Sequence, residues 1–292
     1  MPTRTGELYN EPMKLDFCCP FWGSEPMSFP AFLSRALESG YRGIEIKLPS
    51  EPNFLSDFQQ SLDRHREIDP DFPLVLQCII DPGSSNLDFY ILEIKNKLLE
   101  LSSYAPLFIN SHTGKDYYSF DQNCRILDAM QNLASQKGIR ILHETHRGRF
   151  SFHAPSLVPY LERFPELELA GDFSHFCTVS ESMLEGQEEN LRKIIPNVSH
   201  IHARIGFEQG PQVNDPQAPE WETHSQLFLG WWKSILLDKK ERKWDRFTIS
   251  PEFGPKPYMP LMPYSLEPLS DQWENNRIMK EIIMKSFHTL LS

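Results

Sequence analysis

From residue 141 onward, four short segments each place an acidic or histidine side chain at the end of an apolar run. The segments are 141–146, 169–175, 200–204 and 248–254, and they offer Glu144, Asp172, His202 and Glu252. Three carboxylates and one imidazole suit a single divalent cation. If the fold brings these segments together, the sequence predicts a site for one divalent metal ion, namely Mn²⁺, Zn²⁺, Mg²⁺ or Co²⁺.

The elements that must position these side chains follow a regular alternation of short β-rich runs and longer amphipathic stretches. The predicted strands are 15–21, 43–48, 74–79, 107–112, 140–146, 167–173, 200–205 and 247–252. The predicted helices are 29–39, 54–66, 87–103, 121–136, 156–164, 183–195, 222–238 and 275–291. Gly40 and Gly138 follow two of these helices as stop signals. Eight strands alternating with eight helices indicate an α/β fold, a parallel (β/α)₈ TIM barrel.

The chain has 292 residues, and we interpret all of it, 1–292, as one domain. A TIM barrel often uses about 250 residues as a single domain. The competing doubly wound sheet often has a GxGxxG turn after its first strand, and residues 20–24 lack it. Residues 1–13 are predicted to be an N-terminal extension. Two long Pro-rich loops, 207–221 and 255–273, follow strand ends and are predicted to cover the C-terminal face.

Alternation along the strands tests whether the four candidate ligands share one face. In 200–205 the apolar residues suit the helix side, which turns His202 and Arg204 inward, and in 247–252 the same pattern turns Glu252 inward. Asp172 and Glu144 also fall on the inner parity. Taken singly, each is more simply a helix cap, an ion-pair partner or a core histidine. Because charges inside a barrel are costly unless paired, four at equivalent positions favour one shared metal.

Further polar side chains stand at or just after the predicted strand ends and are candidate substrate contacts. They are Glu45, His112, His146, Arg147, His175 and Arg204. Histidines can orient hydroxyl groups, and arginine binds a carboxylate or phosphate through paired hydrogen bonds. The arginines are explained equally well if they neutralise the negative charge of excess carboxylates near a metal.

Composition narrows the class of partner. The formal net charge of -11 argues against a duplex nucleic-acid partner, which requires a basic face. There is no signal-peptide core and no apolar run long enough to cross a bilayer, so we expect no membrane partner. Five cysteines without a CxxC pair are typical of a reduced, cytoplasmic protein. Cys177 could add a thiol ligand, but a buried small residue is the simpler interpretation.

With these motifs the chain resembles the xylose-isomerase-like TIM-barrel superfamily, the sugar phosphate isomerases and epimerases. The resemblance covers nearly the whole chain, through Gly-Tyr-Arg-Gly-Ile-Glu-Ile (40–46), Asn-Ser-His-Thr-Gly (110–114) and Pro-Glu-Phe-Gly (251–254). It implies that Glu144, Asp172, His202 and Glu252 bind the metal, that Glu144 and Glu252 are also the acid/base pair, and that His175 contacts substrate. The chain departs from the His-x-x-Glu-x-x-Arg pattern of the epimerases, because arginine follows His202 by two residues.

The resemblance implies a metal-dependent isomerase or epimerase of a sugar, sugar phosphate or polyol ketone, working through a metal-stabilised ene-diolate. Its partner would be a small carbohydrate, and members of the family are often dimers or tetramers, so we also consider a homo-dimer or tetramer. A keto-inositol-type dehydratase with the same metal site is an alternative that the sequence does not separate. A metal phosphodiesterase resembling the DNA-repair endonucleases is supported by surplus histidines and opposed by the net charge. A non-catalytic carbohydrate-binding barrel is the last alternative.

Overall fold

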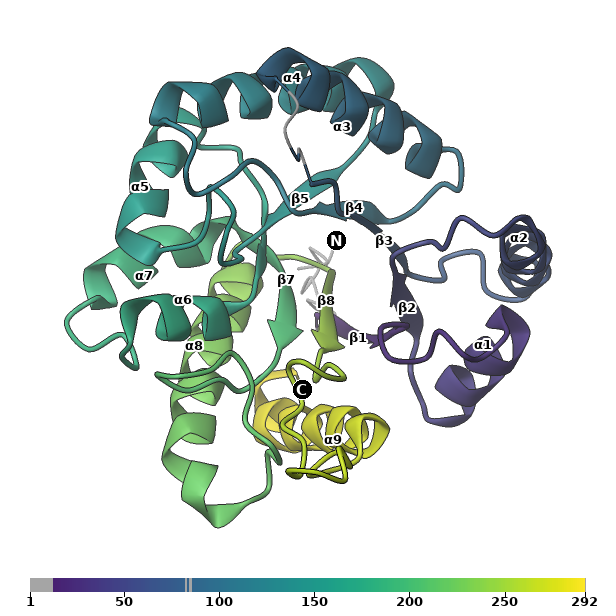
Figure 1. Ribbon diagram of the computed structural model, residues 1–292, viewed down its shortest axis with the longest axis vertical. Helices are drawn as coiled ribbons and strands as arrows, with labels where there is room; N and C mark the ends of the chain where they lie inside the picture. The colour runs from purple at the N-terminus through teal and green to yellow at the C-terminus, as the bar shows by residue number, and fades with distance from the viewer. Residues whose placement is uncertain (1–12, 82, 84–85, 292) are drawn as a thin grey trace, which may run out of the picture.

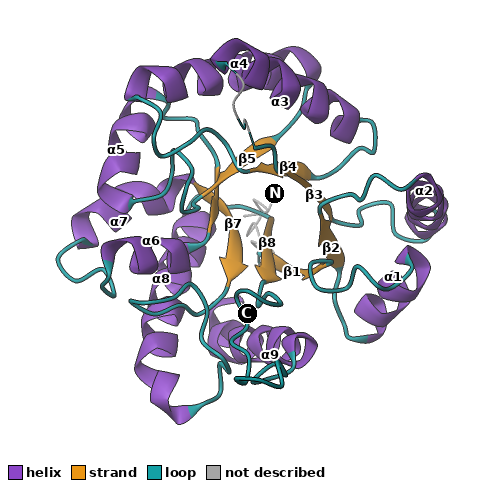
Figure 2. Ribbon diagram, in the orientation of Figure 1, coloured by secondary structure: helices purple, strands orange, loops and turns teal. Residues whose placement is uncertain are grey.

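Eight parallel strands form a closed barrel in sequence order, with the helices outside it (Figures 1 and 2). The computed structural model describes residues 13–81, 83 and 86–291. The strands are β1 (Lys14–Pro20), β2 (Gly43–Ile46), β3 (Leu74–Cys78), β4 (Phe108–Ser111), β5 (Ile141–Glu144), β6 (Leu169–Gly171), β7 (Val198–Ala203) and β8 (Arg246–Pro251). The predicted single-domain (β/α)₈ TIM barrel is confirmed.

The helices surround the barrel (Figure 1). They are α1 (Phe29–Glu38), α2 (Pro52–Arg66), α3 (Leu87–Ser102), α4 (Phe120–Lys137), α5 (Ala154–Arg163), α6 (Phe173–Ser180), α7 (Glu188–Ile194), α8 (Glu222–Glu241) and α9 (Gln272–Leu291). Helix α7 packs beside α5 (Figure 1). Two 3₁₀ turns, Ile195–Asn197 and Pro219–Trp221, precede β7 and α8. No helix among the described residues is long and apolar enough to cross a membrane.

Helix α6 is a difference from the sequence prediction, which extended a strand to residue 173. The Asp172 carboxylate accepts a hydrogen bond of 3.0 Å from the Ser174 backbone N–H, which caps a helix starting at Phe173. The helix predicted over 183–195 begins only at Glu188. Leu184 and Gly186 both have positive φ angles, 66° and 75°, so a right-handed helix cannot run through them.

The barrel interior is divided into an apolar floor and a polar upper layer. The floor is a cluster of buried apolar side chains from β1, β3, β4, β5 and β6: Cys18, Val75, Phe108, Leu142 and Ala170. The Phe108 ring lies 5.2 Å from the ring of His200, which belongs to the polar layer above. The polar side chains at the carboxyl ends of the strands therefore stand on a closed apolar base. A second, larger core fills the space between strands and helices.

The two Pro-rich loops pack against one another over the carboxyl ends of the strands. The Ser270 hydroxyl of the second loop donates a hydrogen bond to the Asn214 carbonyl of the first. Asn275, in the first turn of α9, donates to the same oxygen at 2.9 Å. The predicted N-terminal extension, 1–13, lies outside the described residues except for Met13, which is buried in the core.

Candidate metal and active site

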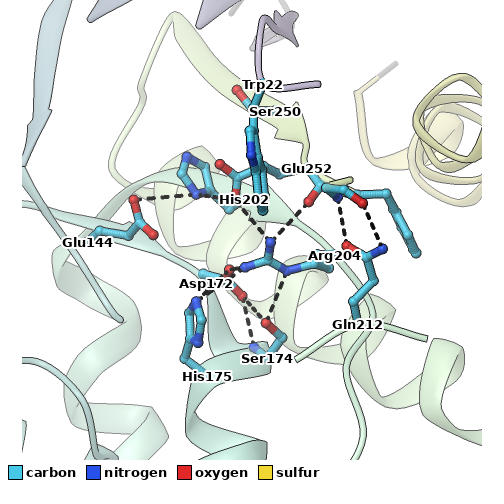
Figure 3. Close-up of polar contacts among 12 residues, drawn as sticks. Trp22, Glu144, Asp172, Ser174, His175, His202, Arg204, Gln212, Ser250 and Glu252 are labelled. Atoms are coloured by element: carbon cyan, nitrogen blue, oxygen red, sulfur yellow. Dashed lines mark hydrogen bonds and ion pairs between the residues drawn. The ribbon is translucent and has the colours of Figure 1, made fainter. Parts of the chain in front are cut away.

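Glu144, Asp172, His202 and Glu252 converge at the carboxyl ends of four consecutive strands, β5 to β8 (Figure 3). One potential ligand atom from each of them lies within 4.8 Å of the other three. All four side chains are buried. The structure thus brings together the residues that the sequence singled out as metal ligands.

The imidazole of His202 gives the clearest sign that this cluster fits a cation. Its Nδ1 atom is buried and has no hydrogen-bond partner among the described residues. Yet Nδ1 lies 2.9 Å from Glu252 Oε2 and 3.7 Å from Glu144 Oε2. A nitrogen lone pair facing carboxylate oxygens at these distances is repulsive unless a proton or a metal ion lies between them. Three oxygen donors and one nitrogen suit Mn²⁺, Mg²⁺, Zn²⁺ or Co²⁺.

The pKa values of the cluster are perturbed by burial and by one another. Burial alone would lower the pKa of His202, but the Glu252, Glu45 and Glu144 carboxylates raise it well above its usual range. Burial alone would raise the pKa of Glu144, but His112 and His202 lower it well below its usual range. Burial raises the pKa of Asp172 to about 6, although Arg204 opposes this. In the absence of a metal, a proton on His202 compensates the carboxylates around it.

Arg204 projects inward from the end of β7, as strand alternation predicts, and is the second cation of the cluster. Its Nη2 donates to Asp172 Oδ2, its Nη1 donates to the Glu252 carbonyl at 3.2 Å, and Nη1 also lies 3.6 Å from Glu252 Oε2. The Tyr258 ring covers the guanidinium, with its centroid 4.7 Å from the guanidinium carbon. Of the two roles that the sequence left open, this geometry favours neutralisation of nearby acid.

A cavity of about 490 Å³ opens onto this cluster, a size suited to a small molecule. Aromatic and apolar residues form part of its wall: Phe21, Trp22, Leu48, Pro49, Ile79 and Tyr258. Its polar wall consists of Glu25, Lys47, Gln77, His112, Glu144, His146, Arg204 and Glu252. The two glutamates of the predicted acid/base pair are therefore both on the cavity wall.

The predicted substrate contacts divide into those on the cavity wall and those away from it. His112, His146 and Arg204 are on the wall, and His112 Nε2 lies 3.0 Å from Glu144 Oε2. His146 Nδ1 donates to the Arg147 carbonyl at 2.6 Å, which leaves its Nε2 to accept a hydrogen bond. Arg147 is not among the wall residues, and its guanidinium carbon lies 5.2 Å from the Tyr258 ring.

Glu45 and His175 are buried and are not among the wall residues of the cavity. Glu45, the third of the four residues of β2, is 1% exposed, and its carboxylate contacts Nε2 of His202. His175 is fully buried in the first turn of α6, which the sequence prediction missed. Its Nε2 faces Arg204 Nη2 at 3.2 Å and Asp172 Oδ2 at 3.6 Å (Figure 3). Both residues touch the candidate ligands instead.

Two other groups of potential ligands overlap with the first. Glu45, His200 and His202 lie together, but Thr248 Oγ1 is 2.7 Å from His200 Nδ1, and hydrogen bonds account for the group without an ion. His112, Glu144 and His146 form the other group. None of these groups, within the part of the chain that the structure describes, contains a cysteine. Cys177 is buried in α6, which agrees with its interpretation as a buried small residue and not with a role as a thiol ligand.

Asn110 on β4, part of the Asn-Ser-His-Thr-Gly motif that the sequence analysis quoted, donates a hydrogen bond of 2.7 Å to Glu144 Oε2. Sequence reasoning missed two residues of the Pro-rich loops that shape the site. Tyr258 and Gln212 come from the Pro-rich loops, where no periodicity shows which way a side chain points. Their contacts with Arg204 and with the segment after Glu252 depend on tertiary structure alone.

The comparison with solved structures gives the fold of the xylose isomerase-like TIM barrel proteins, as the sequence resemblance led us to expect. The probable 3-DHS dehydratase AsbF from Bacillus anthracis superposes with a TM-score of 0.60 at 15% identity, over 94% of this chain and 99% of that one. A xylose isomerase domain protein from Alicyclobacillus acidocaldarius gives 0.56 at 14% identity, over 94% and 99%.

A third similar structure is a xylose isomerase-like TIM barrel protein from Mycobacterium smegmatis, solved in complex with magnesium. It gives a TM-score of 0.57 at 12% identity, over 94% of this chain and 97% of that one. No protein-family model matches the chain, and no curated protein sequence matches it. At such low identity the likeness establishes the fold, and the activity must be argued from the site.

Proposed function

We propose that this protein is a divalent-metal-dependent isomerase or epimerase that moves a proton at a carbon next to the carbonyl group of a small polyhydroxy substrate. Glu144, Asp172, His202 and Glu252 would hold the metal. When bound, the cation supplies Lewis-acid stabilisation of negative charge on substrate oxygens. The chain's own residues supply proton transfer, orientation and exclusion of water.

The observation that carries this proposal is the position of two carboxylates on one cavity wall with an imidazole between them. Glu144 comes from the end of β5 and Glu252 from the end of β8, and Nδ1 of His202 lies within 3.7 Å of an oxygen of each. A substrate held between them presents one face of its reacting carbon to each carboxylate. One glutamate removes the proton, and the other returns it to the opposite face or to the neighbouring carbon.

Neighbouring side chains orient the substrate. The free Nε2 of His146 can accept a hydrogen bond from a hydroxyl group, and His112 stands beside Glu144 on the same wall. Trp22 and Tyr258 add aromatic surface that excludes water from the reacting centre. This combination of one apolar wall and one polar wall suits a small carbohydrate.

A dehydratase of a keto-polyol is the second candidate, and the pair formed by His112 and Glu144 favours it. The hydroxyl group next to the deprotonated carbon leaves as water if a nearby group gives it a proton, and His112, 3.0 Å from Glu144 Oε2 on the cavity wall, is placed to do so in a syn elimination. The likeness to the probable 3-DHS dehydratase AsbF points the same way. A product lighter by one water would identify this reaction, whereas an isomerase product keeps the mass of its substrate.

The test begins with metal content per chain and then measures proton exchange. Purified protein is loaded with Mn²⁺ or Mg²⁺ and incubated in D₂O with a panel of ketoses, aldoses, sugar acids and sugar phosphates, and deuterium incorporation is followed by NMR. We expect exchange in wild type and its near-complete loss in Glu144→Gln and Glu252→Gln. Glu166→Gln, on an exposed loop before β6, is the matched control. A chain that binds no metal and exchanges no proton with any member of the panel would refute the proposal.

A further inference from the structure

Glu45 is a buried carboxylate that lies directly beneath the candidate metal ligands. Three side chains from three other strands donate hydrogen bonds to it. Ser250 Oγ donates to Oε2 at 2.5 Å, while Gln77 Nε2 and Asn110 Nδ2 donate to Oε1 at 3.1 Å and 3.2 Å. These donors fix the carboxylate in one orientation. Because an ionised carboxylate only accepts hydrogen bonds, any further neighbour must donate to it.

That further neighbour is the Nε2 atom of His202. Nε2 lies 3.0 Å from Oε1 and 3.1 Å from Oε2 of Glu45, so it faces both carboxylate oxygens. Only an N–H group at Nε2 satisfies two acceptor oxygens at these distances. A neutral imidazole carries a single N–H, so a hydrogen on Nε2 leaves the lone pair on Nδ1. Nδ1 is the atom that faces Glu144 and Glu252.

We propose that Glu45 is a positioning residue that holds His202 in the Nε2–H tautomer and thereby turns the Nδ1 lone pair toward the metal. This inference rests on the proposed function, because it assumes that the four-residue cluster binds a metal. A carboxylate behind a metal-binding histidine fixes its tautomer and its ring orientation, and loss of such a partner commonly weakens metal binding by about 10- to 100-fold.

His200 also contacts Glu45, but Glu45 does not turn it toward the candidate metal ligands. Its Nε2 also reaches Glu45 Oε2, at 3.3 Å, but its Nδ1 lies 2.7 Å from Thr248 Oγ1, away from the candidate ligands. Thr248 and Glu45 belong to the same buried layer of the barrel. Thr248→Val therefore perturbs that layer without touching the contact between Glu45 and His202, and it is the matched control.

The test compares wild type, Glu45→Gln and Thr248→Val by two readouts that need no substrate. Zn²⁺ affinity is measured by competition with a chelator. The tautomer of His202 is read from long-range ¹⁵N–¹H correlations on Zn²⁺-loaded, ¹⁵N-histidine-labelled protein, with the signal assigned by its loss in His202→Gln. In Glu45→Gln the amide can donate to Nε2, which moves the hydrogen to Nδ1 and opposes metal binding.

We expect Zn²⁺-loaded wild type to show a hydrogen on Nε2 of His202, and we expect Glu45→Gln to bind Zn²⁺ about 10- to 100-fold more weakly while Thr248→Val binds as wild type does. An affinity of Glu45→Gln within twofold of wild type would overturn the inference and leave the proposed function standing. If Glu45→Gln does not fold, the wild-type spectrum decides, since a hydrogen on Nδ1 overturns the inference. Wild type that binds no Zn²⁺ would overturn both.

Discussion

Gln212 and Gly254 are joined by two hydrogen bonds through which a side-chain amide pairs with the backbone (Figure 3). Gln212 Oε1 accepts from the Gly254 N–H at 2.7 Å, and its Nε2 donates to the Gly254 carbonyl at 3.1 Å. Asn276 pairs with Phe253 in the same way, at 2.6 Å and 3.0 Å. These two amides replace a neighbouring strand for the residues that directly follow Glu252, and so they hold the end of β8 in place.

Gln212→Ala should therefore reduce turnover, although Gln212 does not line the cavity. The variant leaves a buried N–H and a buried carbonyl unpaired, which costs about 1–3 kcal/mol of stability each. It also frees the backbone that positions Glu252, and a displacement of about 1 Å at such a group can cost about 100-fold in rate. Gln217→Ala, in the exposed part of the same loop, is the control. Turnover and thermal unfolding of both variants give the comparison, and equal turnover in the two would contradict this role.

Arg204→Met should destabilise the metal-free protein strongly. Arg204 is 1% exposed and donates to Asp172 while lying 3.6 Å from Glu252 Oε2, so its loss leaves two buried carboxylates without this cation. Breaking a buried pair in this way commonly costs about 3–5 kcal/mol. Arg192→Met removes an exposed partner of Glu189 and should change stability by at most about 1 kcal/mol. Denaturant unfolding in the presence of a chelator measures both, and a similar loss in the two variants would argue against the pairing.

Stability should fall as the pH drops from about 6.5 to about 4, in part because of His143. Burial lowers the pKa of His143 to about 4, so the folded protein keeps this ring neutral while the unfolded chain takes up a proton. Since the unfolded state binds more protons across this window, the stabilisation present above pH 6.5 is lost as the pH falls toward 4. Over this pH range the shifted pKa of His143 accounts for roughly 3 kcal/mol of unfolding free energy. The unfolding free energy of His143→Gln should depend less steeply on pH, by about one proton. A curve parallel to that of wild type would exclude His143 as the cause.

The sequence predicted the architecture and the convergence of Glu144, Asp172, His202 and Glu252, because strand parity and position within a β/α unit fix which side chains reach the carboxyl end of a barrel. Strand alternation shows whether a side chain points into the barrel, but it does not show whether that side chain reaches the cavity. Glu45 points inward as alternation requires, but it lies below the cavity and contacts His202.

The sequence could not show that His175 is buried against Arg204, because the helix that carries it is short and begins at a cap that also belongs to the site. The contacts of Gln212 and Asn276 could not be predicted from the sequence for another reason. They join a loop and a distant helix to the end of β8. Local patterns of hydrophobicity do not predict contacts between segments that are distant in the sequence.

Asp172 has two tasks, and two substitutions at this position should separate them. Its Oδ1 accepts the hydrogen bond that begins α6, and its Oδ2 accepts the Arg204 bond, while the carboxylate as a whole is part of the candidate metal cluster. Asparagine caps a helix about as well as aspartate, whereas alanine costs about 1 kcal/mol at such a position. Asp172→Asn should then keep the cap but bind metal weakly, because it removes a negative charge from the cluster.

Asp172→Ala should lose both the metal and the cap, so it should be less stable than Asp172→Asn by about 1 kcal/mol in the presence of a chelator. Metal content by elemental analysis and unfolding free energy, measured on the same preparations, distinguish the two effects. If both variants retain one metal per chain, Asp172 acts as a helix cap and a partner for Arg204, and the metal depends on Glu144, His202 and Glu252.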